Sequence, residues 1–390
     1  MIENCVNDLL SFVHYTGKYI KKVHKKKKKI LSPPLLYRLK KLTAKGAVAD
    51  IYTLSCHESG DTPFVCHPNK ERLVKVISRK INIKINDFEQ EILAKNILGT
   101  GHPNIKVALD SGLCYVNDGG QRVLKQCLLL EPCGKELLER INDNTSDKKY
   151  YADDKKYVAE NLVIIEQMKS ALQFMHKKEF IHRDLKTENI LWNGINACII
   201  DFGFSKHKNI DECTEVLGTS KFLYPGIIHT ERSKKARKEN RKLDIFKYNG
   251  RFADEWSMSV VFFVMFFKSY PHCIIDKTEN KKEIHDILIK GDYVEEEIFL
   301  KVSEIIINSF LFQNFSSEAK KFFKILLHSF RIFWKTHLNF LNGEKNFHPE
   351  NAFKDLCDLI LQKTPDSLIN GLKQYQNKYL PNNDQIQIEI

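Results

Sequence analysis

The sequence lacks the features of a secreted or membrane-spanning chain. No N-terminal signal pattern is present, because Asn7, His14 and Lys18 interrupt the apolar residues before position 20. The apolar run at 260–267 is too short to cross a bilayer and predicts a buried helix. The ten cysteines show no regular pairing or metal-ligand spacing, which disfavours a zinc site. We therefore expect an intracellular protein, cytoplasmic or nuclear, with reduced thiols and no membrane span.

The charge of the chain is basic and unevenly spread. Its 390 residues carry 61 Lys and Arg against 49 Asp and Glu, for a net charge of +12. Two basic runs, 21–29 and 232–242, contribute to the excess, and neither is interleaved with aromatic residues, so a base-stacking surface is not indicated. The runs predict contact with an acidic partner or nucleic acid, or nuclear import; a solvated surface explains them equally well.

Two motifs carry most of the functional information. Residues 182–191 read His-Arg-Asp-Leu-Lys-Thr-Glu-Asn-Ile-Leu, and residues 201–203 read Asp-Phe-Gly. Together, in this order and at this spacing, they resemble the catalytic loop and metal-binding loop of a eukaryotic protein kinase. The resemblance implies an α+β, two-lobed protein-kinase-like fold. Its N-lobe would be small and β-rich with one main helix, and its C-lobe larger and mainly α-helical.

The resemblance assigns a role to each polar residue of these motifs. Phosphoryl transfer from ATP relies on positioning and charge compensation. Asp184 is implied as the catalytic base at the incoming hydroxyl, and Lys186 as the contact to the γ-phosphate. Asn189 and Asp201 are implied as oxygen ligands of Mg²⁺, with Mn²⁺ as the alternative ion. Lys186 also favours Ser or Thr over Tyr as the acceptor.

Residues 201–226 match the activation segment of the family. Thr219 is implied to hydrogen-bond Asp184 and Lys186, which again favours a protein substrate with a Ser or Thr acceptor. Gly226 stands where the family carries a glutamate that pairs with a late arginine. Because the context of that arginine is also missing, we expect the pair to be lost together, at some cost in stability or with a substitute contact.

Glu215 occupies the position that is usually phosphorylated, four residues before Thr219. Its carboxylate predicts a permanent negative charge for Arg183, so that activity needs no phosphorylation of the segment. Thr214 is the competing switch. Further along, Asp254 is implied to hold the backbone of the catalytic loop.

The ATP side of the site departs further from the family pattern. Residues 44–52 match the phosphate-covering loop, but only one of its three glycines remains. The candidate nucleotide-binding residues of this loop are Ala44, Lys45, Gly46, Ala49 and Ile51.

Lys75, flanked by apolar residues in a predicted strand at 72–78, resembles the lysine that binds the α- and β-phosphates. Its glutamate partner is Glu89 or Glu91. Glu89 shares the apolar face of the predicted helix at 85–98, which favours it; Glu91 lies closer to the usual distance from the motif at 102–104.

Residues 128–134 resemble the hinge between kinase lobes. Glu131 and Cys133 are implied to hydrogen-bond adenine, and Glu136 to reach the ribose. We divide the chain accordingly into a basic N-terminal extension (1–36), an ATP-binding N-lobe (37–131), a C-lobe with a basic insert at 228–251 (132–345), and a C-terminal helical extension with a polar tail (346–390).

The resemblance implies a serine/threonine protein kinase. One alternative is a pseudokinase scaffold, which only the poor glycine loop and the change at Gly226 favour. Another is a basic nucleic-acid-binding protein on a kinase-like frame, supported only by the two basic runs.

Overall fold

A computed structural model describes residues 9–12, 35–45, 49–56, 72–77, 87–118, 121–143, 155–238, 244–268, 270–271, 316–344, 346–362 and 365–380. The chain forms two compact units. The first comprises residues 1–133 with 200–203, and the second comprises 134–199 with 204–390. The first is small and rich in strands, and the second is larger and mainly helical, so the predicted α+β class is confirmed.

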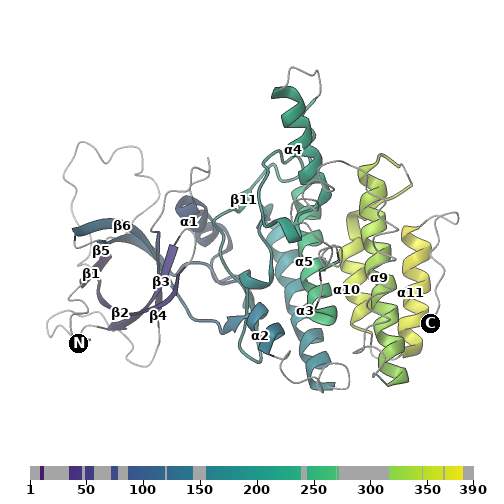
Figure 1. Ribbon diagram of the computed structural model, residues 1–390, viewed down its shortest axis with the longest axis horizontal. Coiled ribbons are helices and arrows are strands. Elements are labelled where there is room, and N and C mark those ends of the chain that lie inside the picture. The colour runs from purple at the N-terminus through teal and green to yellow at the C-terminus, as the bar shows by residue number, and fades with distance from the viewer. Residues whose placement is uncertain are drawn as a thin grey trace, which may run out of the picture. The chain divides into compact units, whose positions relative to one another are not determined.

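A six-stranded antiparallel sheet forms most of the first unit, in the order β1-β2-β3-β4-β6-β5 (Figure 1). Its strands are β1 (Leu9–Phe12), β2 (Leu35–Lys45), β3 (Ala49–Cys56), β4 (Arg72–Ile77), β5 (Asp110–Asp118) and β6 (Gln121–Leu130). β1 falls within the range assigned to the N-terminal extension, yet it pairs with β2 and so joins the sheet.

Alternation along β4 sets the direction of its side chains. Val74 and Val76 are fully buried, whereas the intervening Lys75 lies on the opposite face of the strand. Helix α1 (Asp87–Leu98) packs Phe88 and Ile92 against Leu128 of β6. Acidic residues in its first turn complement the helix dipole, and Gly99 (φ 53°) ends it.

Helices form the body of the second unit. They are α2 (Leu137–Asp143), α3 (Lys155–Lys177), α4 (Pro225–Lys238), α5 (Gly250–Phe267), α9 (Ser317–Leu341), α10 (Ala352–Ile360) and α11 (Pro365–Tyr379). Figure 1 shows α3, α5, α9, α10 and α11 side by side.

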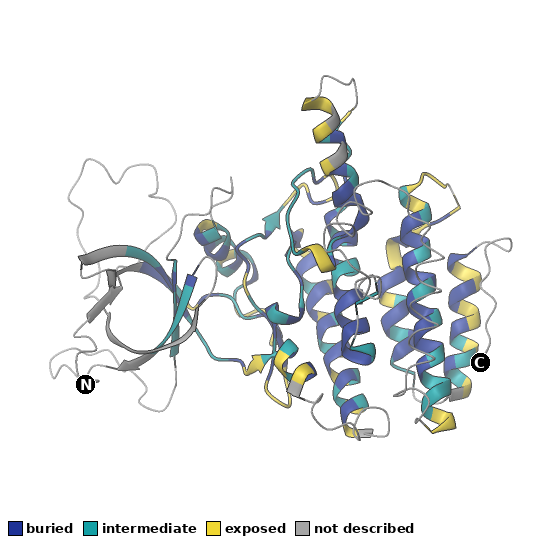
Figure 2. Cartoon of the chain, viewed as in Figure 1, coloured by how far each residue is buried: buried dark blue, intermediate teal, exposed yellow. Residues whose placement is uncertain are grey.

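The apolar run at 260–267 lies in α5. Residues 258–266 are buried (Figure 2), and the ring of Phe263 meets Phe330 of α9 edge to face, so the prediction of a buried helix is confirmed. The side chain of Asn249 caps the start of α5 by accepting from the Arg251 N–H. Within the described ranges, no helix combines the length and apolarity needed to cross a membrane.

Short strands hold the segment that carries the kinase-like motif. β8 (Phe180–Ile181) pairs with β11 (Lys206–His207), and β9 (Ile190–Trp192) lies between β7 (Lys135–Glu136) and β10 (Ala197–Ile199). Residues 182–189 therefore run between two paired strands, with a 3₁₀ turn, η1, at Thr187–Asn189. A second such turn, η2 (Ser220–Phe222), precedes α4, and a third, η4 (Pro349–Asn351), precedes α10.

Candidate active site

In the first unit, three charged groups meet at Lys75. Its Nζ lies 2.9 Å from Oε1 of Glu91 and 2.7 Å from Oδ1 of Asp201. Side-chain exposure is 13% for Lys75 and 4% for Glu91, but 44% for Asp201, so one end of the cluster faces solvent. Burial alone would lower the pKa of Lys75, but the carboxylates of Asp201 and Glu91 raise it overall. The lysine is therefore charged at neutral pH.

The preference for Glu89 as the partner of Lys75 is wrong. Glu89 is exposed in the first turn of α1, whereas Glu91 is buried and pairs with Lys75. Helix geometry explains the difference: Glu91 follows Phe88 by three residues and precedes Leu98 by seven, so it shares their buried face. Leu93 and Ile97, on whose spacing the preference for Glu89 was based, are only half-buried.

Three strands bring part of the predicted phosphate-covering loop into register with Lys75. Ala44 of β2 pairs with Ile51 of β3, and Ile51 pairs with Lys75 of β4. Lys45 pairs with Asp50 at the end of the same ladder, and Ala49 is buried. Gly46 lies outside the described residues.

The hinge-like residues end the first unit and begin the second. The carboxylate of Glu131 accepts from Lys106 at 3.2 Å and lies 3.6 Å from Arg72. Cys133 is buried. Glu136 lies in β7, and its pKa is raised by burial and by the neighbouring carboxylates of Glu139 and Glu188.

Reduced thiols were expected, and Cys213 and Cys357 are free and buried. Burial raises the pKa of both free thiols, so they stay protonated at neutral pH.

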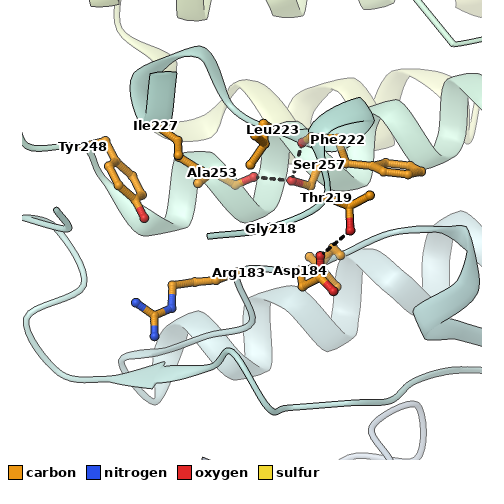
Figure 3. A pocket seen from close by; sticks show the side chains of 11 residues that line it. Arg183, Asp184, Gly218, Thr219, Phe222, Leu223, Ile227, Tyr248, Ala253 and Ser257 are labelled. Carbon is orange, nitrogen blue, oxygen red and sulfur yellow. Dashed lines mark hydrogen bonds between the residues drawn. The ribbon is translucent and has the colours of Figure 1, made fainter. Parts of the chain in front are cut away.

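In the second unit, four predicted site residues form one hydrogen-bonded cluster around Asp184. Its Oδ1 accepts from the Thr219 hydroxyl at 2.8 Å (Figure 3), and its Oδ2 lies 3.0 Å from Lys186 Nζ. Asn189 donates to the same oxygen at 3.2 Å, and Lys186 also donates to Thr219 at 3.1 Å. Three donors from separate positions therefore fix the orientation of the carboxylate.

Gly218 permits Thr219 to reach Asp184. Its φ of +117° suits glycine, and a Cβ there would lie 3.0 Å from the Arg183 carbonyl oxygen and 2.9 Å from a Leu223 methyl. On the other side, Ser257 of α5 donates to the Phe222 carbonyl at 2.7 Å and anchors η2 (Figure 3).

Asp254 holds the catalytic loop as predicted. It is fully buried, and its two oxygens accept from the backbone N–H groups of His182 at 2.8 Å and Arg183 at 2.9 Å. These bonds support Arg183, whose φ of +67° is unusual for a side chain of that size. The Arg183 guanidinium donates to the carbonyls of Phe204 at 2.6 Å and Ser205 at 3.1 Å.

Glu215 faces two cations. Its carboxylate lies 3.4 Å from Arg183 Nη1 and 3.4 Å from Lys206 Nζ. Burial alone would raise the pKa of Glu215, but backbone hydrogen bonds and the two cations lower it overall. The predicted proximity of Glu215 to Arg183 is confirmed. Lys206 is a second partner of Glu215, which the sequence did not predict.

Two further contacts to this segment were missed. Lys234 of α4 donates to the Thr214 carbonyl, and the Tyr248 hydroxyl donates to the Glu215 carbonyl at 2.7 Å. Nothing in the sequence distinguishes Lys234 from its neighbours in the basic run at 232–242. Of that run, residues 232–238 belong to α4 and the rest lies outside the described residues, as does the run at 21–29.

Comparison with known proteins gives one family. A family model described as protein kinase domain matches residues 67–367. Calcium-dependent protein kinase 5 of Plasmodium berghei (strain Anka) is 29% identical over 256 residues, covering 64% of this chain and 36% of the relative.

Other relatives match over shorter ranges. Myosin light chain kinase 2, skeletal/cardiac muscle, of Homo sapiens is 30% identical over 175 residues, covering 44% of this chain and 25% of the relative. Serine/threonine-protein kinase SAPK2 of Oryza sativa subsp. indica is 32% identical over 160 residues, 40% of each chain. The matches thus span between a quarter and two fifths of these relatives.

Proposed function

The chain belongs to the eukaryotic protein kinase superfamily, and on that premise we propose that it transfers the γ-phosphate of ATP to serine and threonine hydroxyls of proteins. The observation that carries the proposal is the cluster around Asp184. A hydroxyl, an ammonium group and an amide contact this carboxylate, and in this proposal they would hold it in the orientation that phosphoryl transfer needs. A scaffold without activity would have no need of three such donors.

Each residue of the cluster has a separate task in this proposal. Asp184 would align the acceptor hydroxyl and take up its proton. Lys186, 3.1 Å from Thr219, would offset negative charge on the transferred group. Thr219 would fix both side chains and leave room for a small aliphatic hydroxyl, which supports Ser or Thr as the acceptor. Lys75, which burial and two carboxylates keep in place, would bind the α- and β-phosphates.

The donor atoms also suit Mg²⁺. Asn189 directs its NH₂ group to Asp184, which leaves the amide oxygen as a neutral ligand, and the carboxylate of Asp201 is 44% exposed. Among the described residues, no group of three or more His, Cys, Asp or Glu could hold a metal ion by itself. This suits Mg²⁺, which binds through few protein oxygens together with water and substrate phosphates. When bound, the ion supplies charge compensation on the phosphates.

The test is transfer of labelled phosphate from γ-labelled ATP to a panel of proteins. The wild-type chain should label a substrate, and Asp184→Asn should lower the rate about 10²–10⁴-fold, the range for a positioned acid or base. Equal labelling by both proteins would refute the role of Asp184. No labelling by the wild-type chain, with ATP still bound, would favour the pseudokinase alternative.

A further inference from the structure

The basic insert lies against the segment that carries Glu215. After α4, the chain returns through residues 244–249 before it enters α5. This return segment, residues 244–249, is tied to α4: the Phe246 N–H donates to the Ser233 hydroxyl at 2.9 Å, and the Thr230 hydroxyl donates to the Phe246 carbonyl at 3.0 Å. The helix and the return segment are therefore held together.

The return segment and Gly250, which follows it, make backbone contacts with residues 210–213. Cys213 and Tyr248 exchange two hydrogen bonds, of 2.8 and 2.9 Å, as an isolated antiparallel bridge. The Gly250 N–H donates to the Ile210 carbonyl at 2.7 Å. Lys247 and Glu212 pair at 2.7 Å, but both side chains are exposed, so this ion pair contributes little.

Two side chains of the insert form hydrogen bonds with Thr214 and Glu215, which follow residues 210–213 in the chain. Lys234 donates to the carbonyl of Thr214, and Tyr248 donates to the carbonyl of Glu215. Burial raises the pKa of Tyr248, so its hydroxyl stays protonated and able to donate. Lys234 is half-buried, whereas the neighbouring Lys235 is exposed. Lys234 therefore has a fixed acceptor within the chain, the Thr214 carbonyl.

These two bonds fix the backbone on both sides of the Glu215 Cα atom. The Glu215 side chain is thereby directed to Arg183, whose buried Nη1 has no hydrogen-bond partner among the described residues and lies 3.4 Å from that carboxylate. Arg183 directly precedes Asp184. The contacts thus run without interruption from α4 through Glu215 to the catalytic loop.

We propose that the insert is an internal brace, in which Lys234 and Tyr248 are positioning residues that hold Glu215 against Arg183 and keep the segment ordered without phosphorylation. This rests on the proposed kinase activity, since ordering the segment matters only if Asp184 is catalytic. On this proposal, Lys234 of the basic run binds another segment of the same chain rather than a partner.

Two measurements on the full chain test the brace. Hydrogen exchange of residues 210–216 reports on the brace whether or not the protein is active. Lys234→Ala should speed exchange there at least about 5-fold, the effect of a bond worth about 1 kcal/mol. Lys234→Arg, which can still donate, should restore protection, and the matched control Lys235→Ala should behave as wild type. Tyr248→Phe should speed exchange of the same residues.

The second measurement is steady-state phosphoryl transfer. Lys234→Ala should lower kcat about 5-fold with the KM for ATP unchanged, while Lys235→Ala and Thr214→Ala retain wild-type rates. Equal exchange in Lys234→Ala and Lys235→Ala would refute the brace, as would loss of activity in Thr214→Ala or after phosphatase treatment. If exchange responds as expected but the wild-type chain transfers no phosphate, the proposed function fails and the ordering of the segment by Lys234 stands.

Discussion

The catalytic loop and the region around Gly226 are built on different physical principles, although both belong to the second unit. At the loop, charged and polar groups are paired individually: Asp184 with three donors, and Asp254 with two backbone N–H groups. Around Gly226, aromatic rings pack together. His337 lies 5.8 Å from Tyr224 and 4.5 Å from Phe333, measured between ring centroids.

The difference shows which parts of the site tolerate change. The family's glutamate cannot fit at Gly226, because a Cβ there would lie 2.7 Å from the Tyr224 ring. The Tyr224 ring next to this position packs against the rings of Trp256 and His337, a contact that needs no charge. Bracing can be achieved by apolar packing as well as by an ion pair. The groups around Asp184 have no such alternative, because phosphoryl transfer needs their charges and donors.

The largest effect should come from Asp254. Asp254→Ala leaves two buried backbone N–H groups unpaired, each at a cost of about 1–3 kcal/mol, so the free energy of unfolding should fall by about 4 kcal/mol. Chemical denaturation measures this loss. The control is Asp244→Ala, which removes an exposed acid of the return segment and should change stability little. A small loss in Asp254→Ala would contradict the importance of charge pairing in the loop.

The second effect concerns the charged cluster of the first unit. Glu91→Ala removes the carboxylate that accepts from Lys75; it should lower the free energy of unfolding by about 1.5–3 kcal/mol, the value of a hydrogen bond to a charged group, and should raise the KM for ATP. Glu89→Ala changes the same residue type on the exposed side of α1 and should have neither effect. Similar behaviour of the two variants would mean that Lys75 does not depend on Glu91.

Introducing the family's glutamate at position 226 should lower the stability of the protein. Gly226→Glu introduces a Cβ 2.7 Å from the Tyr224 ring and 3.1 Å from the Tyr248 Cβ, and overpacking of this kind costs about 1–3 kcal/mol. Thermal unfolding should show a lower Tm. The loss should be smaller when Tyr224→Ala removes the nearest ring. A stabilising effect of Gly226→Glu would show that an ion pair still fits this region.

The last prediction is a dependence of stability on pH. Burial lowers the pKa of His337 to about 3, so between about pH 6.5 and 3 the unfolded chain binds a proton that the folded chain does not. Stability from this residue is present above pH 6.5 and is lost as the pH falls, by at most about 1.4 kcal/mol per unit. His337→Phe should flatten the stability profile in this window, whereas the exposed His348→Ala should leave it unchanged. Unchanged slopes in both would place His337 outside the packed cluster.

How much the sequence could predict depends on the kind of contact. Thr219 was expected to hydrogen-bond Asp184 and Lys186, and it does, because motif spacing and local strands determine their positions. The hydrogen bond from Asn189 to Asp184 was not predicted. The choice of Glu89 over Glu91 was wrong because two residues along a helix turn the side chain to another face, and the buried face of α1 carries Phe88, Glu91 and Ile92.

The brace could not be predicted at all. Whether Lys234 or Lys235 turns inward depends on how α4 packs against a segment 20 residues earlier in the chain, and both residues have the same side chain. The packing of aromatic rings near Gly226 could not be predicted from the sequence either. His337 is more than 100 residues from Tyr224, so only tertiary structure brings their rings together.

The most direct measurement identifies the amino acid that receives the labelled phosphate. Wild-type protein with Mg²⁺ and γ-labelled ATP should yield phosphoserine or phosphothreonine in a substrate protein, and Asp184→Asn should yield almost none. Labelling of tyrosine, or equal labelling by Asp184→Asn, would contradict a serine/threonine kinase that acts through Asp184.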